Sequence, residues 1–197
     1  MSDTLYEKSN TGDDGFATWY GANWEAETFT PSITHTITSV KLLMYRDDGE
    51  LPGTITLSIR GTTANLPSGA DLCSGTTNGN TLEITGVGEW REITLGAGTL
   101  LIAGTKYAKV FRAITGDASN RVRSRVTNPG TYSGGSAVYS SDSGVNWTDY
   151  GTFDYQFEEY GIGIAGEGMG LIVIQGTNLH YVDANGDERY LTGTLVT

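Results

Sequence analysis

A short run at residues 53–60 alternates strictly between apolar and polar side chains, and it constrains the fold more than any other feature of the chain. Ile55, Leu57 and Ile59 occupy every second position, separated by threonine and serine. Because successive strand residues point to opposite sides, the run has one apolar face and one polar face. It therefore predicts a strand of an antiparallel sheet with one side on a core.

A second alternating run lies just upstream, at residues 35–46, and contains Val40, Leu42 and Met44. Between the two runs, Asp47-Asp48-Gly49 is typical of a turn. We therefore expect the two runs to pair as a hairpin that seeds a β-sandwich.

Short strand-like segments recur over residues 16–160, and no segment has a convincing helical period. This pattern predicts an all-β fold, a jelly-roll β-sandwich of about eight strands. Glycine, serine and proline predict loops at residues 62–80 and 96–104.

Composition divides the chain further. Residues 1–15 are predicted to be an N-terminal arm, and the glycine-rich residues 161–170 a linker. Residues 171–197 are predicted to be a small C-terminal β-hairpin module, because Asn185-Gly186 separates two alternating runs. So small a unit has too few apolar residues for a core of its own, so we expect it to serve in attachment or oligomerisation.

Charge and apolar content exclude several classes of partner. The 197 residues carry a formal net charge of −11, which argues against nucleic-acid binding because phosphate contacts need a basic surface. The N-terminus lacks the basic and then apolar layout of a signal peptide, and no apolar run approaches the ~20 residues that span a bilayer. The lone cysteine, Cys73, is expected to be a small buried apolar side chain.

Residues 140–147 fit the pattern Ser-x-Asp-x-Gly-x-x-Trp, with Asp142, Gly144 and Trp147 at the fixed positions. The run resembles an Asp-box, the hairpin signature of sialidases and related propellers. In that resemblance the aspartate caps the turn and the tryptophan packs beneath it. The motif predicts a hairpin and carries no catalytic role.

Two acidic turns could hold a cation or simply reverse the chain. Residues 183–188 are rich in oxygen donors, but they lack the distal glutamate of an EF-hand. Asp13 and Asp14 form a similar short turn. We favour the plain turn in both places and expect no metal and no cofactor.

Two sets of residues are candidates for partner docking. Arg121, Arg123 and Arg125 alternate along one strand face. This favours either contact with an acidic partner surface or an anionic glycan, or pairing with carboxylates of the chain itself. In the C-terminal module the candidates are apolar and aromatic: Leu171, Val173, Leu179, Tyr181 and Tyr190.

Aromatic residues near predicted turns are candidates for stacking on sugar rings, although core packing is the competing interpretation. The candidate ligand residues are Trp19, Tyr20, Trp147 and Tyr150. Trp24 and Trp90 lie in strand-like runs and are expected in the core.

No set of residues indicates catalysis. His35 and His180 are the only histidines, and neither has a cysteine or histidine nearby at a metal-ligand spacing. Glu158 and Glu159 are adjacent, so on a strand they face opposite sides and cannot act as a pair.

Residues 24–160 resemble the jelly-roll domains that recur in phage and archaeal-virus structural proteins and in microbial surface proteins. The matching segments are residues 28–31, 39–42, 53–60, 89–91, 103–108 and 142–147. The fold is similar to that of carbohydrate-binding modules. Residues 170–195 look like short β-elements of phage tail and head-fibre proteins.

These resemblances imply a non-enzymatic virion structural protein of a tailed phage: a capsid decoration, head-fibre or tail-associated subunit that displays a lectin-like jelly roll. The implied partners are other virion proteins, further copies of the chain (a trimer is one option) and a host surface glycan. The implied location is the virion, assembled in the host cytoplasm, which fits the lack of a signal peptide. The alternatives are a carbohydrate-binding or adhesin module and, with no catalytic set to support it, a glycan-active enzyme.

Overall fold

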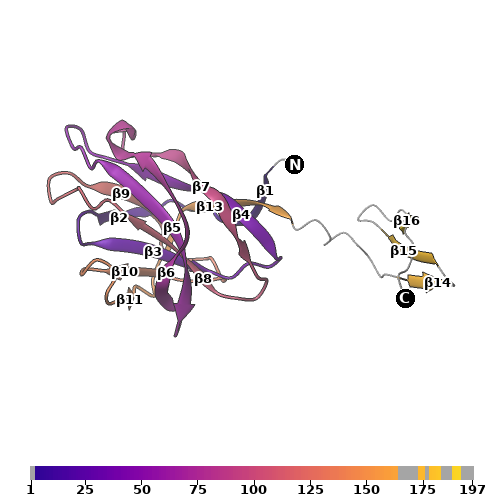
Figure 1. The fold of residues 1–197 in the computed structure, drawn as a ribbon. Helices are drawn as coiled ribbons and strands as arrows, with labels where there is room; N and C mark the ends of the chain where they lie inside the picture. The colour runs from indigo at the N-terminus through magenta and orange to yellow at the C-terminus, as the bar shows by residue number, and fades with distance from the viewer. Residues whose placement is uncertain (1–2, 164–172, 176–177, 183–187, 192–197) are drawn as a thin grey trace. The chain divides into compact units, whose positions relative to one another are not determined.

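The protein is nearly all β-structure (Figure 1). The computed structural model describes residues 3–163, 173–175, 178–182 and 188–191, the last three as backbone only. Within these residues the helical structure is limited to a 3₁₀ turn at Gly79–Thr81. The chain divides into two compact units, Met1–Ile162 and Gly163–Thr197.

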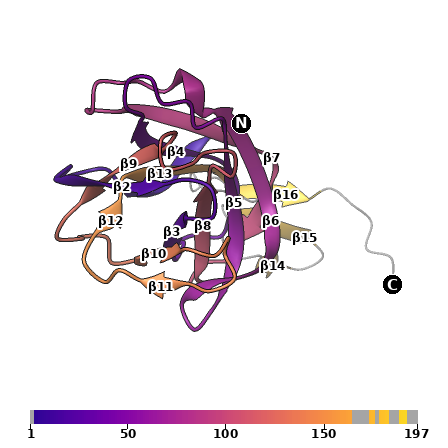
Figure 2. The ribbon, with the colours of Figure 1, turned by 90° about the vertical axis from the view of Figure 1, so that its left-hand side faces the viewer.

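The first unit contains two antiparallel sheets (Figures 1 and 2). The seven-stranded sheet consists of β1 (Thr4–Ser9), β2 (Gly15–Trp19), β4 (His35–Tyr45), β7 (Glu89–Leu101), β9 (Val122–Thr127), β12 (Asp154–Tyr155) and β13 (Phe157–Gly163). The six-stranded sheet consists of β3 (Trp24–Phe29), β5 (Thr54–Thr63), β6 (Leu66–Asn78), β8 (Tyr107–Arg112), β10 (Ala137–Ser140) and β11 (Thr148–Asp149).

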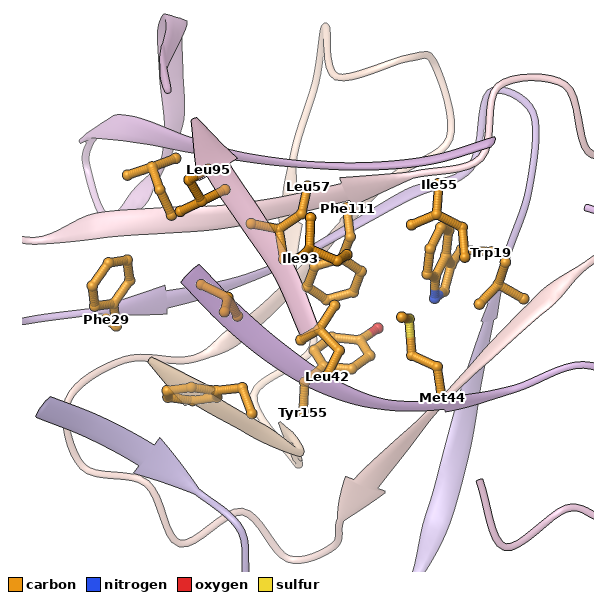
Figure 3. Packing of buried hydrophobic residues seen from close by; sticks show 14 of the residues in the cluster. Trp19, Phe29, Leu42, Met44, Ile55, Leu57, Ile93, Leu95, Phe111 and Tyr155 are labelled. Atoms are coloured by element: carbon orange, nitrogen blue, oxygen red, sulfur yellow. The ribbon is translucent and has the colours of Figure 1, made fainter. Parts of the chain in front are cut away.

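The core lies between the two sheets, and the alternation in the sequence accounts for it (Figure 3). Ile55, Leu57 and Ile59 of β5 are fully buried, and they belong to one cluster with Leu42 and Met44 of β4 in the opposite sheet. The predicted β-sandwich is therefore confirmed.

The hairpin expected between the two alternating runs is wrong. β4 and β5 lie in different sheets, so the turn at Asp47-Asp48-Gly49 carries the chain from one sheet to the other. β5 pairs instead with β6 and with β8. Each run needs to bury its apolar face. Two strands can do this by facing each other across the core as well as by pairing in one sheet.

Three segments predicted as loops or as an arm are strands. Most of residues 62–80 belongs to β6, most of residues 96–104 extends β7, and residues 4–9 form β1, which pairs with β13. In β6, Gly75 has no room for a side chain, because a Cβ atom there would lie 1.9 Å from the carbonyl oxygen of Thr94 in β7. Small residues that resemble a loop sequence thus allow the two sheets to approach closely.

The second unit contains a three-stranded antiparallel sheet formed by β14 (Val173–Gln175), β15 (Asn178–Val182) and β16 (Glu188–Leu191). β15 pairs with β16, with Val182 opposite Glu188, as the predicted hairpin requires. The turn between them, which carries Asn185-Gly186 and the oxygen-rich run, lies outside the described residues.

Candidate binding cleft

A cleft of about 440 Å³ opens in the surface of the first unit. It is lined by residues 128–130, 132, 135–136 and 151–154. These residues come from the connection between β9 and β10, from the connection between β11 and β12, and from the first residue of β12. The volume falls within the range of about 300–1,000 Å³ that is usual for small-molecule sites.

Hydrogen bonds from backbone amides hold the two sides of the cleft together. The amide of Gly130 donates to the carbonyl oxygen of Thr152 (3.0 Å), and the amide of Tyr132 donates to Oδ2 of Asp154 (2.6 Å). A Cβ atom at Gly130 would lie 2.7 Å from the same Asp154 oxygen. Glycine at this position therefore lets the first connection close over the carboxylate.

Two half-buried aromatic rings, Tyr132 and Phe153, form part of the cleft wall. The ring of Tyr132 meets that of Phe157 edge-on at 5.1 Å, and the ring of Phe153 lies 4.6 Å from that of Tyr150. Because both rings pack against further rings of the sandwich, their positions are fixed from behind. Their free surfaces are available to a ligand at little cost in side-chain entropy.

Asp154 is the acidic residue of the lining, and the residue is only 4% exposed. Its Oδ2 atom accepts a hydrogen bond from the amide of Tyr132, and Gly130 lies close to the same oxygen. A donor group of a ligand in the cleft can add to the hydrogen bond from the Tyr132 amide.

Two further acids of β3 lie buried behind the cleft. The hydroxyl of Tyr150 donates to Oε1 of Glu25 (3.0 Å), and the amide of Tyr155 donates to Oε2 of Glu27 (3.0 Å). Burial raises the pKa of Glu25 to about 8, against the opposing effect of the tyrosine hydroxyls, and burial raises the pKa of Glu27 well above 4.5. At neutral pH Glu25 is therefore mainly protonated, and neither buried acid can be reached by a ligand.

A lysine is buried beside these acids. The Nζ atom of Lys109 lies 3.5 Å from the ring centroids of both Phe29 and Phe157, and it has no hydrogen-bond partner among the described residues. Burial lowers the pKa of Lys109 to about 7, although Glu159 and Glu27 favour its charged form. The aromatic faces stabilise the fraction that remains protonated.

The structure does not gather the four predicted ligand residues into one site. Trp19 is a correction: it is fully buried in the core, where its indole N–H donates to Oγ of Ser124 (2.9 Å), so no sugar can reach its ring. Tyr20 is half-buried at a turn. Tyr150 lies beside the cleft, behind Phe153, and Trp147 packs on the outer side of the six-stranded sheet.

The two tryptophans predicted for the core are also placed differently. Trp90 is 39% exposed. Trp24 is half-buried on the outer side of the six-stranded sheet, with the guanidinium groups of Arg112 and Arg60 at 4.9 and 5.6 Å from its ring centroid. Their strands were predicted correctly, but alternation along a strand does not say which face is inside.

The three arginines predicted as a docking stripe pair with carboxylates of the same chain. Arg121 and Arg123 both contact Glu50, at 2.6 and 3.0 Å, and Arg125 pairs with Asp13. The alternative of internal pairing is therefore what the structure shows, and docking on a partner stays a prediction. Of the C-terminal candidates, Leu171 lies outside the described residues, and for the other four only the backbone is described: Val173, Leu179, Tyr181 and Tyr190.

The Asp-box-like run forms the turn that its pattern predicts, between β10 and β11. Oδ1 of Asp142 accepts hydrogen bonds from the amide of Asn146 (2.9 Å) and the hydroxyl of Ser140 (2.8 Å). The bonds from Asn146 and Ser140 lower the pKa of Asp142 to about 2. Asp142 thus caps the turn, which is a structural role.

The main cleft residues, Tyr132, Phe153 and Asp154, were missed in the sequence. The run at residues 128–135 was recognisable as a glycine-rich loop, but its approach to residues 151–154 depends on tertiary structure. Neither a comparison with known protein families nor one with curated proteins found a match. Within the described residues, no helix is long and apolar enough to span a membrane, and no three metal-ligating side chains form a cluster.

Proposed function

We propose that the protein is a non-enzymatic structural protein of a tailed-phage virion whose β-sandwich is displayed as a carbohydrate-binding module. The resemblance of residues 24–160 to virion and surface jelly rolls supports the first half of this proposal. So does the division of the chain into a sandwich and a small separate C-terminal unit, which suits display and attachment.

The cleft carries the binding half of the proposal. Sugar rings combine apolar C–H faces with hydroxyl groups, so their sites pair aromatic surfaces with a few placed polar groups. The cleft offers Tyr132 and Phe153 as aromatic surfaces, with Asn128, Ser136 and Asp154 beside them.

Binding fits the cleft better than hydrolysis. Glycoside hydrolysis ordinarily uses two carboxyl groups that flank the scissile bond. Asp154 is the one carboxylate in the lining, while Glu25 and Glu27 are 3% and 0% exposed and lie behind it. This supports a role without catalysis.

The same cleft would serve a carbohydrate-binding or adhesin module outside a virion. The context of the gene separates the two: capsid and portal genes as neighbours support the virion protein, and genes for polysaccharide enzymes favour the alternative. Light scattering on the full chain and on residues 1–162 tests the C-terminal unit. We expect an oligomer only for the full chain, and monomers in both cases would exclude this role.

A blocked cleft tests the binding half. Thr152 is exposed and lines the cleft, so Thr152→Arg should fill it without removing any core side chain. On a glycan array we expect the wild-type chain to bind at least one glycan and Thr152→Arg to lose that binding. Thr148→Arg is the matched control, because Thr148 is exposed on β11 but is not part of the lining. No glycan bound by the wild-type chain would contradict the carbohydrate-binding role.

A further inference from the structure

The only ionisable charge in the cleft lining is negative. The lining contains Asp154 and no lysine, arginine or histidine. An anionic sugar placed there would meet a carboxylate with no cationic group to pair with its own charge. Since like charges repel and nothing in the lining offsets the carboxylate, uronic and sialic acids do not suit this cleft.

Two further acids contact residues of the cleft lining. The amide of Gly151 donates to Oδ1 of Asp149 (2.7 Å), and the amide of Asn128 contacts Oδ2 of Asp14 (3.4 Å). Gly151 and Asn128 themselves line the cleft. The negative charge of Asp154 is therefore reinforced by its surroundings.

Lys109, which lies opposite Glu27 on the neighbouring strand, is not free to neutralise the cleft. Lys109 lies between two phenylalanine rings and is fully buried. It forms no ion pair within 4 Å among the described residues, so Asp154 has no cationic partner there. A cation that compensates Asp154 has to come from the ligand.

Resting on the carbohydrate-binding role proposed above, we propose that the cleft selects an amino sugar, with the ligand's ammonium group on Asp154 and its ring against Tyr132 and Phe153. A charge-assisted hydrogen bond to a nearly buried carboxylate is about twice as strong as a neutral one. The two aromatic rings add attraction for the same cation. Hydroxyl groups of the sugar reach the polar side chains of Asn128 and Ser136.

Three oligosaccharides of equal length test this with the full chain by isothermal titration calorimetry at pH 6. They are oligomers of glucosamine, of N-acetylglucosamine and of galacturonic acid, which carry positive, zero and negative charge. We expect the glucosamine oligomer to bind most tightly and the galacturonate oligomer not at all. Asp154→Asn should weaken the glucosamine oligomer about tenfold and change the N-acetyl oligomer by less than about threefold. Asp117→Asn, in an exposed turn far along the chain, is the matched control and should change neither.

The variant Thr152→Arg excludes nonspecific attraction between a cationic oligomer and an acidic protein. It should abolish binding of the glucosamine oligomer, and undiminished binding would overturn the assignment to the cleft. A galacturonate oligomer that binds as tightly as glucosamine, or an Asp154→Asn variant with unchanged preference, overturns the amino-sugar inference but leaves carbohydrate binding intact. If no glycan of an array binds, the carbohydrate role itself fails. Melting curves establish that each variant is folded. If Asp154→Asn does not fold, Thr152→Arg still tests whether the glucosamine oligomer binds in the cleft.

Discussion

Glu25 shows how the interior of the sandwich sets the charge of a single side chain. It is 3% exposed on β3, with one oxygen held by the hydroxyl of Tyr150. Removal from water raises its pKa from 4.5 to about 8. The folded protein therefore holds a proton on Glu25 over a range of pH in which the unfolded chain releases it.

This difference predicts that Glu25 lowers stability as the pH rises. The folded state binds more protons than the unfolded state between pH 4.5 and about 8, so the contribution of Glu25 to the free energy of unfolding falls across that window. The full shift corresponds to on the order of 5 kcal/mol. Glu25→Gln mimics the protonated acid, so its free energy of unfolding should fall less between pH 5 and pH 8 than that of the wild-type chain.

Urea unfolding at both pH values measures this. Glu83→Gln is the control, because Glu83 is exposed and should leave the pH dependence unchanged. Identical pH slopes for the wild-type chain and Glu25→Gln would show that Glu25 is ionised in the folded protein.

The same scale marks the limit of the sequence-based site prediction. Trp19 lies next to a turn, which made it a ligand candidate, but its pairing with Val122 at the end of β2 turns the ring into the core. Asp154 and Tyr132 could not be predicted as site residues. The amide that binds Asp154 lies 22 residues away in the chain, and nothing in the local sequence indicates this contact. Proximity of that kind arises only when both sheets are in place.

At the scale of elements, the long hairpin of β5 and β6 is the clearest difference between prediction and structure. β5 was predicted from Ile55, Leu57 and Ile59, but β6 offers Cys73, Gly75 and Thr77 opposite them. Its small residues suggested a loop. The small residues are needed because β7 of the other sheet lies close to β6 at this point. No local pattern in the sequence of β6 indicates this close approach.

Gly75→Ala tests this close approach. The added Cβ atom would lie 1.9 Å from the carbonyl oxygen of Thr94, so the two strands must separate. We expect a loss of about 1–3 kcal/mol in the free energy of unfolding, as for other overpacked cores. The matched control is Gly61→Ala in β5, where a Cβ atom meets nothing within 4 Å. Equal stability of the two variants in urea unfolding would show that the sheets yield easily at this point.

At the scale of the whole molecule, the sandwich has a core of its own. All residues of the main core cluster lie between Trp19 and Phe157, and the last strand of the sandwich pairs with the first. We therefore expect residues 1–162 to fold alone, with the same near-UV circular dichroism and the same urea midpoint as the sandwich transition of the full chain. A shortened chain that no longer unfolds cooperatively would show that the C-terminal unit contributes to the core.

The pairing of β1 with β13 has a consequence for how this module can be carried. Thr4 lies opposite Gly161, so the first and last strands of the sandwich begin and end side by side. A domain whose two ends lie close together can be inserted into a surface loop of another protein with little distortion of that protein. For the same reason, joining these ends and opening the chain at an exposed turn such as residues 47–49 should yield a circular permutant that keeps both sheets.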